Sequence, residues 1–270
     1  MASLPWTVAT WNVNSLRVRL PQLLPWLAAA RPDVVCLQET KVVDELFPAA
    51  DLKAAGYDAA FSGQKTYNGV AILWRAELPA PADVRAGLDG DGPDAHKRYL
   101  TARFGALTIA SVYVPNGSEV GSEKYAFKLD WLRRLEATLA ARPETGTPLL
   151  LCGDFNIAPE DRDVYDADEV RGGIMFSEKE QGALRSLAAS RELTDTLRLH
   201  TQAAGLYSWW DYRAAGFQRN RGWRIDFILA SPQAARACTG ASIDVAPRRL
   251  EKPSDHTPVL AAFRLGAEGG

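Results

Sequence analysis

Carboxylate and amide side chains recur at the ends of apolar runs in the 270-residue chain. Glu39 follows one such run, Asp154 follows another, Asp226 interrupts a third and Asp255 precedes the last. An ionised carboxylate beside a buried strand is costly unless it is paired or bound to a metal ion. Carboxylate and amide oxygens favour Mg²⁺ or Mn²⁺ over Zn²⁺. The pattern therefore predicts a hard-cation site, with further amides from Asn12, Asn14 and Asn156.

These residue types are the parts that phosphodiester hydrolysis requires. A cation neutralises the charge that develops on the phosphate oxygens, and a carboxylate activates the attacking water. A histidine, His256, directly follows Asp255 and is suited to binding a phosphate or an oxyanion. The composition of the predicted site thus favours a metal-dependent hydrolase.

Each residue also has a purely structural explanation. Glu39 is a candidate cap, Asp154 and Asn156 belong to a good turn sequence, and a single histidine such as His256 is often a buried structural residue. Asp226 is harder to explain in this way, because both of its neighbours are large and apolar. The joint occurrence of the five in one chain favours catalysis.

Short apolar runs rich in β-branched and aromatic residues predict the strands that position these side chains. The expected strands cover residues 7–12, 33–38, 70–74, 101–104, 108–114, 149–153, 225–229 and 259–263. Helices are expected over residues 21–30, with Pro21 in the first turn, over 122–141, and after the capping-box pair Ser177 and Glu180. In the second helix, Phe127, Trp131, Leu135 and Leu139 form the apolar stripe. Residues 86–94 and 159–169 are expected to be surface loops. The mixture predicts a single α/β domain over residues 1–270.

Composition excludes several classes of protein. Hydrophobic residues make up 47% of the chain, charged residues 24%, and the net charge is −2, which argues against disorder and against a polycation that binds nucleic acid by bulk charge. The three cysteines are widely spaced, and neither a signal-peptide pattern nor a long apolar run is visible. We therefore expect a cytoplasmic protein without membrane contact.

The chain resembles the exonuclease III family of apurinic/apyrimidinic (AP) endonucleases, within the endonuclease/exonuclease/phosphatase superfamily. The matching motifs are WNVN at residues 11–14, LQETK at 37–41, NGVA at 68–71, YVPNG at 113–117, GDFNIAP at 153–159, SWWDYR at 208–213, RGWRID at 221–226 and SDH at 254–256. The Glu, Asp-x-Asn and Ser-Asp-His elements are shared with phosphatases and lipases of the superfamily. LQETK and WDYR are specific to the exonuclease III branch.

The resemblance implies a four-layer α/β sandwich of the DNase I-like type, with two face-to-face mixed β-sheets flanked by helices. It implies that Glu39 is the main metal ligand and that Asn12, Asn14 and Asp255 complete or support the metal site. Asn14 stands where some members carry an acid, so the number of bound metal ions stays open. The sequence after YVPNG lacks an arginine that certain relatives insert into DNA, and the loop 161–173 is variable in the family.

Catalytic roles also follow from the resemblance. Asp154 would activate the attacking water, Asn156 would help to place the phosphate, and His256, oriented by Asp226, would contact the scissile phosphate. Tyr113 and Asn116 would hold the phosphate oxygens or the leaving group.

The aromatic block near the end of the chain would bind the substrate. Trp209, Trp223 and Ile225 match positions that wall a pocket for an extrahelical abasic deoxyribose, which excludes a nucleotide that still carries its base. Tyr212, Arg213 and Arg221 would contact DNA nearby. A tryptophan-rich core is the alternative explanation for these aromatic residues.

The expected activity is hydrolysis of the phosphodiester 5′ to an abasic site, which leaves a 3′-hydroxyl, with 3′→5′ exonuclease and 3′-phosphatase or phosphodiesterase activity. Mg²⁺ or Mn²⁺ would be the cofactor, double-stranded DNA with abasic sites or blocked 3′ ends the partner, and a nucleoid-associated monomer the working form. The alternatives are a superfamily phosphatase or phosphodiesterase acting on phosphoinositide or sphingomyelin, and a DNA-binding module with a decayed site.

Charge is segregated along the chain in a way that suits DNA binding. Residues 154–195 contain 5 basic and 11 acidic side chains, whereas residues 207–252 contain 8 basic and 4 acidic ones. The basic stretch flanks the predicted sugar pocket, so we expect duplex affinity to fall with salt. Neutralising Arg213, Arg221 and Arg248 together should flatten that dependence; a solvated basic face is the alternative.

Overall fold

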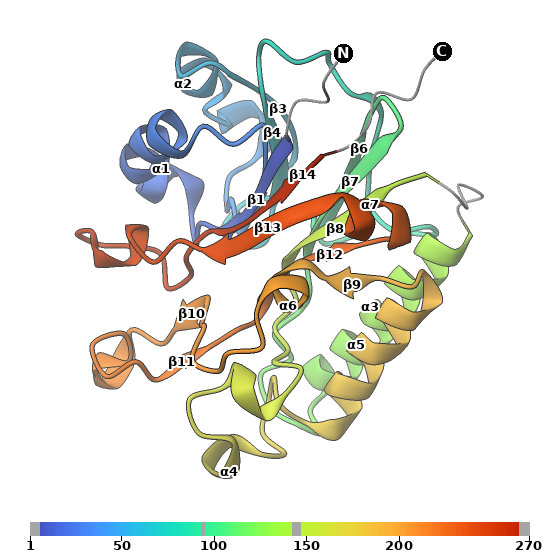
Figure 1. Cartoon of the computed structure of the whole chain (residues 1–270), viewed down its shortest axis with the longest axis vertical. Coiled ribbons are helices and arrows are strands. Elements are labelled where there is room, and N and C mark those ends of the chain that lie inside the picture. Colours follow the sequence, from blue (N-terminus) through green and yellow to red (C-terminus); the bar gives the residue numbers. More distant parts are fainter. Residues whose placement is uncertain (1–5, 93–94, 142–146, 265–270) are drawn as a thin grey trace.

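Two six-stranded β-sheets lie face to face in the computed structural model, which describes residues 6–92, 95–141 and 147–264 (Figure 1). The first sheet has the order β13 (Cys238–Ile243), β14 (Val259–Phe263), β1 (Trp6–Asn12), β2 (Val34–Gln38), β4 (Val70–Arg75) and β3 (Tyr57–Ser62). The second has the order β5 (Ala82–Ala86), β6 (Tyr99–Phe104), β7 (Leu107–Tyr113), β8 (Leu149–Asp154), β12 (Asp226–Ala230) and β9 (Thr194–Asp195). The pairs β1/β2 and β7/β8 are parallel and the others antiparallel, so both sheets are mixed.

The central strands are buried on both faces, and their side chains alternate between two cores. In β2, Val34 and Cys36 point into the core between the sheets, whereas Val35 and Leu37 point outward to the helical layer. In β8, Leu150 and Cys152 face the same inner core. This two-sided burial explains why the strands read as continuous apolar runs in the sequence.

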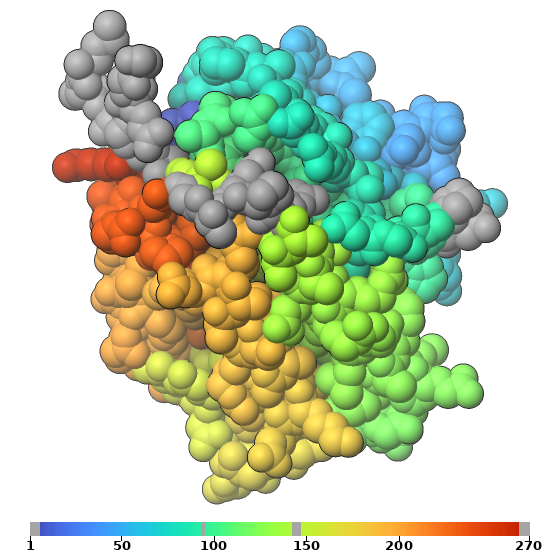
Figure 2. Space-filling model, turned by 90° about the vertical axis from the view of Figure 1, so that its right-hand side faces the viewer, coloured from blue at the N-terminus to red at the C-terminus, as the bar shows by residue number. Residues whose placement is uncertain are grey.

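Helices cover both outer faces (Figure 1). Over the first sheet lies α1 (Leu16–Ala30), which packs through Leu23 and Leu27, with α2 (Ala49–Ala54) beside it. Over the second sheet lie α3 (Glu123–Ala140) and α5 (Glu178–Ser190), which run side by side on the face shown in Figure 2. The expected four-layer sandwich is thus confirmed, and no helix in the described part of the chain is long and apolar enough to cross a membrane.

The remaining elements in the described part of the chain are short. They are α4 (Ala167–Val170), α6 (Thr196–His200), α7 (Pro232–Ala237), the hairpin of β10 (Trp209–Trp210) and β11 (Gly222–Trp223), and 3₁₀ turns at Asp44–Leu46, Asp161–Asp163, Arg213–Ala215 and Pro247–Arg249. The segment 159–169, expected as a loop, therefore contains two short helices. The loop expected at 86–94 begins at the last residue of β5, and its residues 93 and 94 lie outside the described residues.

Two expectations about helices were wrong. The first helix begins at Leu16 rather than at Pro21, because backbone hydrogen bonds from Ser15 and Leu16 to the carbonyls of Glu39 and Thr40 fix its first turn against the residues that follow β2. In α3, Ser122 caps the helix as its position suggests, but Phe127 is 41% exposed and does not belong to the buried stripe. The capping box of Ser177 and Glu180 is confirmed.

Candidate active site

Strand register places three of the candidate residues in a row across the second sheet. Asp154, the last residue of β8, is directly paired with Tyr113 at the end of β7 and with Asp226 at the start of β12. Directly opposed residues project from the same face of a sheet. The three side chains therefore converge at one edge.

The first sheet contributes Asn12 and Glu39 to the same edge. Asn12 ends β1 and is fully buried, and its Nδ2 donates to Glu39 Oε1 at 2.8 Å and to Asp154 Oδ2 at 2.9 Å. Glu39 directly follows β2 and has a φ of 51°, so the chain turns away as soon as its side chain has been placed. One amide therefore bridges carboxylates from the two sheets.

The Asp154 carboxylate accepts three hydrogen bonds from N–H groups. Besides the bond from Asn12, it receives one from the backbone N–H of Asn156 at 2.8 Å and one from Asn156 Nδ2 at 3.2 Å. Burial raises the pKa of Asp154 to about 7, although His256 opposes the rise. A carboxylate with a pKa near neutrality is suited to exchanging a proton with water.

His256 is oriented by a buried acid. Its Nδ1 lies 2.9 Å from Asp226 Oδ2, and Ser208 Oγ donates to the same carboxylate at 2.6 Å. Burial alone would lower the pKa of His256, but the carboxylates of Asp226 and Asp154 raise it to about 10. His256 is therefore a cation at neutral pH, with Nε2 at 3.6 Å from Asp154 Oδ2.

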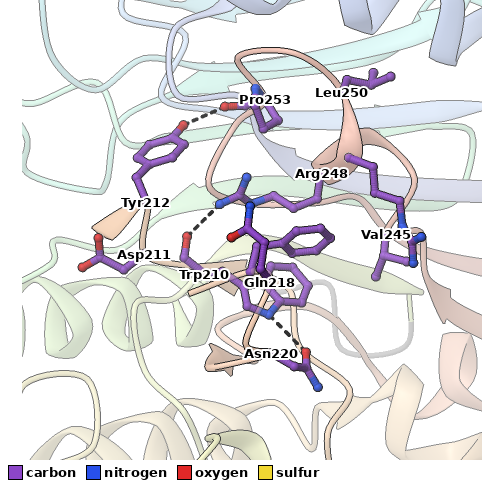
Figure 3. A pocket seen from close by; sticks show the side chains of 11 residues that line it. Trp210, Asp211, Tyr212, Gln218, Asn220, Val245, Arg248, Leu250 and Pro253 are labelled. Atoms are coloured by element: carbon purple, nitrogen blue, oxygen red, sulfur yellow. Dashed lines mark hydrogen bonds between the residues drawn. The ribbon is translucent and has the colours of Figure 1, made fainter. Parts of the chain in front are cut away.

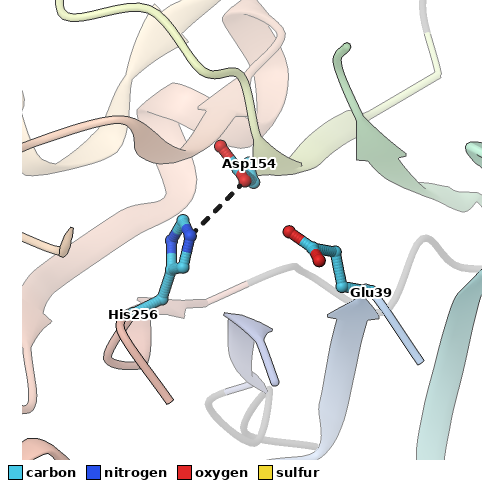
Figure 4. Close-up of side chains that lie close together, drawn as sticks. All are labelled: Glu39, Asp154 and His256. Atoms are coloured by element: carbon cyan, nitrogen blue, oxygen red, sulfur yellow. Dashed lines mark ion pairs between the residues drawn. The ribbon is translucent and has the colours of Figure 1, made fainter. Parts of the chain in front are cut away.

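Glu39, Asp154 and His256 form the one cluster in the described residues whose potential ligand atoms lie close enough to share a metal ion (Figure 4). One ligand atom from each lies within 4.8 Å of the others. The oxygen donors suit a hard divalent cation, and the surrounding acids supply the negative charge that such an ion needs. Lys41 Nζ, at 2.8 Å from Glu39 Oε2, already holds positive charge beside this carboxylate. The donor set thus fits a divalent metal at Glu39.

Asn14 and Asp255, also expected near the metal, are linked to each other instead of directly to Glu39. Asn14 Nδ2 donates to Asp255 Oδ1 at 2.9 Å, and Trp209 Nε1 donates to Asp255 Oδ2 at 3.0 Å. Lys41 connects the two groups, because its ammonium also donates to Asn14 Oδ1 at 2.5 Å. Asp255 therefore lies between the acidic centre and the aromatic block.

Tyr113 and Asn116 lie on the side of the second sheet. Burial raises the pKa of Tyr113 well above its usual value, and the carboxylates of Glu39 and Asp154 raise it further. The phenol therefore keeps its proton and is available as a hydrogen-bond donor. Asn116 Nδ2 donates to Asn156 Oδ1 at 3.1 Å, which joins the two asparagines into one amide pair.

The three residues expected to wall a sugar pocket do come together. Trp209 and Trp223 pair across the β10/β11 hairpin with ring centroids 6.3 Å apart, and Trp223 and Ile225 belong to one apolar cluster. Trp209 is also 6.4 Å from the His256 ring, centroid to centroid. Trp209 remains partly exposed whereas Trp223 is buried, so one ring presents its surface next to the acidic centre.

The arginines of the basic stretch differ in their environments. Arg213 is exposed and paired with Asp211, and Arg221 is paired with Glu169. Arg248 is only 7% exposed, lies between the rings of Tyr212 and Phe217, and lines a cavity of about 740 Å³ (Figure 3). The half-exposed Tyr212 bonds to Pro253 O at 2.8 Å and borders that cavity. Arg248 is thus a buried arginine, unlike the exposed Arg213 and the partly exposed Arg221.

Sequence reasoning did not assign roles to three residues that contact the site. Lys41 and Ser208 lie inside the motifs LQETK and SWWDYR, so their motif positions were the available signal. Arg98 stacks over the Tyr113 ring at 4.5 Å and donates to its carbonyl at 3.2 Å, and it follows a loop without a recognisable pattern.

Comparison with known proteins identifies relatives over nearly the whole chain. The model of the endonuclease/exonuclease/phosphatase family matches residues 9–256. Exodeoxyribonuclease III of Haemophilus influenzae is 38% identical over 267 residues, covering 94% of this chain and 98% of the relative. Among solved structures, the 3′ phosphatase NExo from Neisseria, bound to a product DNA hairpin, superimposes with a TM-score of 0.91 at 42% identity, and an AP endonuclease from Archaeoglobus fulgidus with 0.89 at 39%. Both alignments cover 96% of this chain and 100% of the other.

Proposed function

The chain belongs to the endonuclease/exonuclease/phosphatase family, and we propose that it hydrolyses the DNA phosphodiester on the 5′ side of an abasic site, leaving a 3′-hydroxyl. It is a divalent-metal-dependent phosphodiester hydrolase and a DNA repair nuclease of the exonuclease III type. The observation that carries the proposal is the convergence of Glu39, Asp154 and His256 beside the aromatic block at Trp209.

The reaction is in-line attack of water on the scissile phosphorus. Asp154 accepts a proton from the attacking water, since its carboxylate is held by three N–H donors and its pKa is near neutral. The His256 cation and the Tyr113 hydroxyl stabilise the charge that builds up on the phosphate oxygens. Glu39 would hold a divalent ion, and that ion would supply further neutralisation of the charge on the phosphate oxygens and on the leaving 3′-oxygen.

The roles of the remaining residues are part of the proposal. Asn116 and Asn156 place the phosphate through their joined amides, and Asp226 orients His256. Asn12 supports the metal site directly through Glu39, whereas Asn14 and Asp255 support it through Lys41. We propose Mg²⁺ or Mn²⁺ as the metal, because the donors are oxygens. Both sheets supply parts of one centre, which supports a single domain over residues 1–270 acting as a monomer.

The chemistry of the aromatic block suits an abasic sugar. The partly exposed ring of Trp209 offers a flat apolar surface for one face of the deoxyribose, and the buried Trp223 and Ile225 support it from behind. A nucleotide that retains its base is bulkier and costs more energy to extrude from the stack. The same centre would also act on 3′ ends, where the hydrolysed bond again involves a 3′-oxygen; the similarity to NExo, described as a 3′ phosphatase, supports this.

A side-by-side assay of three duplexes tests the proposal. One carries a single abasic site, one a nick, and one a 3′-phosphate, each incubated with Mg²⁺ or Mn²⁺. We expect incision of the abasic duplex together with removal of the 3′-phosphate and slower shortening from the nick. Turnover of a lipid headgroup without cleavage of any of the three would overturn the proposal.

Salt dependence of DNA binding tests the roles of Arg213, which is exposed, and Arg221, which is partly exposed. The slope of log affinity against log salt concentration is negative, and each phosphate contact contributes about −0.9 to it. Replacing both Arg213 and Arg221 by Gln should therefore make the slope less steep by about 2. Arg248 is not included, because it is buried between two rings. Duplex binding is measured by fluorescence anisotropy between low and physiological salt.

The matched control replaces two exposed arginines far from the site, Arg31 and Arg133. Each is also paired with an acid, Arg31 with Glu77 and Arg133 with Asp130. An unchanged slope in this control is expected. Equal slopes for both double variants would show that Arg213 and Arg221 do not contact the DNA backbone.

A further inference from the structure

A fully buried lysine lies directly beneath the loops that carry Asn116 and Asn156, the two asparagines proposed to place the phosphate. Lys128 is on the buried face of α3, one helical turn from Tyr125 and Trp131, and its side chain has no exposed surface. Its Nζ donates to the backbone carbonyl of Asn156 at 2.7 Å and to that of Asn116 at 3.0 Å. The third partner is the carboxylate of Glu180. All three ammonium protons are thus used.

Glu180 belongs to a second buried network that ties down the neighbouring loop. Its Oε1 accepts from the Met175 N–H at 3.0 Å, and its Oε2 accepts from Ser177 N at 3.1 Å and Ser177 Oγ at 2.5 Å. The side chain of Glu180 is fully buried as well. The ion pair therefore connects α3, α5 and the loops that follow β7 and β8.

The loop after β7 is shaped to lie against the lysine. Gly117 has a φ of 91°, and a Cβ at that position would meet Lys128 Cδ at 3.1 Å and Ile174 Cδ1 at 3.0 Å. The glycine thus permits the close approach that brings the Asn116 carbonyl to the ammonium. A bulkier residue at this position would push the loop away from Lys128.

Stability alone is a poor explanation for this arrangement. Burying two charges costs desolvation free energy, and well-packed apolar residues usually stabilise a fold as well as a buried ion pair does. Burial indeed lowers the pKa of Lys128, and Glu180 opposes that effect. What an apolar side chain cannot do is hold two backbone carbonyls at fixed positions. Those carbonyls belong to the two residues whose amides are bonded to each other, and Asn156 in turn bonds to Asp154.

We propose that Lys128, fixed by Glu180, is a positioning residue that sets the orientation of the Asn116 and Asn156 amides toward the phosphate. The proposal rests on the proposed function, since it concerns how the same centre holds its phosphate. Lys128 itself does not touch the substrate. Its effect passes through the two carbonyls, and it should therefore alter turnover without altering the metal site at Glu39.

Kinetics of two variants test the inference. Glu180→Gln keeps Lys128 and its two carbonyl bonds, whereas Lys128→Met with Glu180→Gln removes the carbonyl bonds and leaves no unpaired buried charge. We expect the double variant to turn over an abasic duplex about 10- to 100-fold more slowly than Glu180→Gln, as small misplacements of substrate-holding groups do. The metal concentration for half-maximal activity should stay the same in both variants, and a thermal melt confirms folding.

The outcomes separate the two hypotheses. An inactive wild-type protein would count against the proposed function, whereas an active wild type with equal turnover in the two variants would overturn the inference. A shifted metal requirement would also overturn it, because that would indicate a general disturbance. If the double variant does not fold, Gly117→Ala is used instead, because its added methyl group crowds Lys128 Cδ and moves the loop while both charged groups stay in place. Wild-type turnover in that variant would overturn the inference.

Discussion

Replacing Asp154 by Asn should lower kcat on an abasic duplex by about 10²- to 10⁴-fold, the range associated with loss of a general base. The carboxylate accepts three hydrogen bonds from N–H donors, two from Asn156 and one from Asn12. An Asn side chain has one acceptor oxygen and places its own N–H₂ group against one of these donors. It also cannot take a proton from water. Single-turnover rates at saturating metal measure the effect.

Asp33→Asn is the matched control for this change. Asp33 is also buried and accepts hydrogen bonds, from the Thr7 N–H at 2.7 Å and from Arg75, but it precedes β2, at the opposite end of that strand from Glu39. This variant should lose stability and keep its turnover. An Asp154→Asn enzyme that retained more than a tenth of the wild-type kcat would contradict the assignment of Asp154 as the base.

Replacing His256 by Ala should cause a loss of similar size, about 10²-fold or more. The imidazolium Nε2 lies 3.6 Å from Asp154 Oδ2, and Ala also leaves the buried Asp226 carboxylate without its histidine partner. His200→Ala is the control, because His200 is an exposed residue at the end of α6. Activity is compared at equal concentrations of folded protein.

A double-mutant cycle shows whether Asp226 acts through His256. Asp226→Asn should reduce kcat in the wild-type background and have little further effect once His256 is Ala, because coupled residues give non-additive effects. The pH profile gives a second readout. The pKa of His256 is raised to about 10, so its positive charge is present below that pH and is lost as the pH rises through it. Activity should fall along that alkaline limb in the wild type and not in His256→Ala. Additive effects in the cycle would contradict the relay from Asp226.

The sheet architecture was predictable where strands are buried on both faces. β1, β2, β4 and β8 are continuous apolar runs, and all were expected within one or two residues. Edge strands were missed, because a strand such as β5 is exposed along its whole length and its sequence resembles that of a loop. The start of α1 was misplaced because a proline such as Pro21 is usually an early helical residue, whereas here hydrogen bonds to the residues that follow β2 set the first turn.

The candidate residues could be chosen from the sequence, but their geometry could not. Burying an unpaired charge is costly, so an acid inside an apolar run, as at Asp226, or directly after one, as at Glu39 and Asp154, indicates a functional residue from the local sequence alone. The pairing of Asp226 with Asp154, and the bridge from Asn12, depend on contacts between strands far apart in the chain. Lys128 gave a weak local signal, a lysine within an apolar stripe, which acquires meaning only from the loops above it.

Incision by metal-assisted hydrolysis is tested most directly by the chemistry of the product ends. A duplex with one abasic site is incubated with the wild-type protein and Mg²⁺, with an EDTA control, and the new ends are identified by mass spectrometry. We expect a 3′-hydroxyl and a 5′-deoxyribose phosphate that form only when the metal is present. A 3′-unsaturated aldehyde from β-elimination, or cutting that persists in EDTA, would contradict hydrolysis by water activated at Asp154.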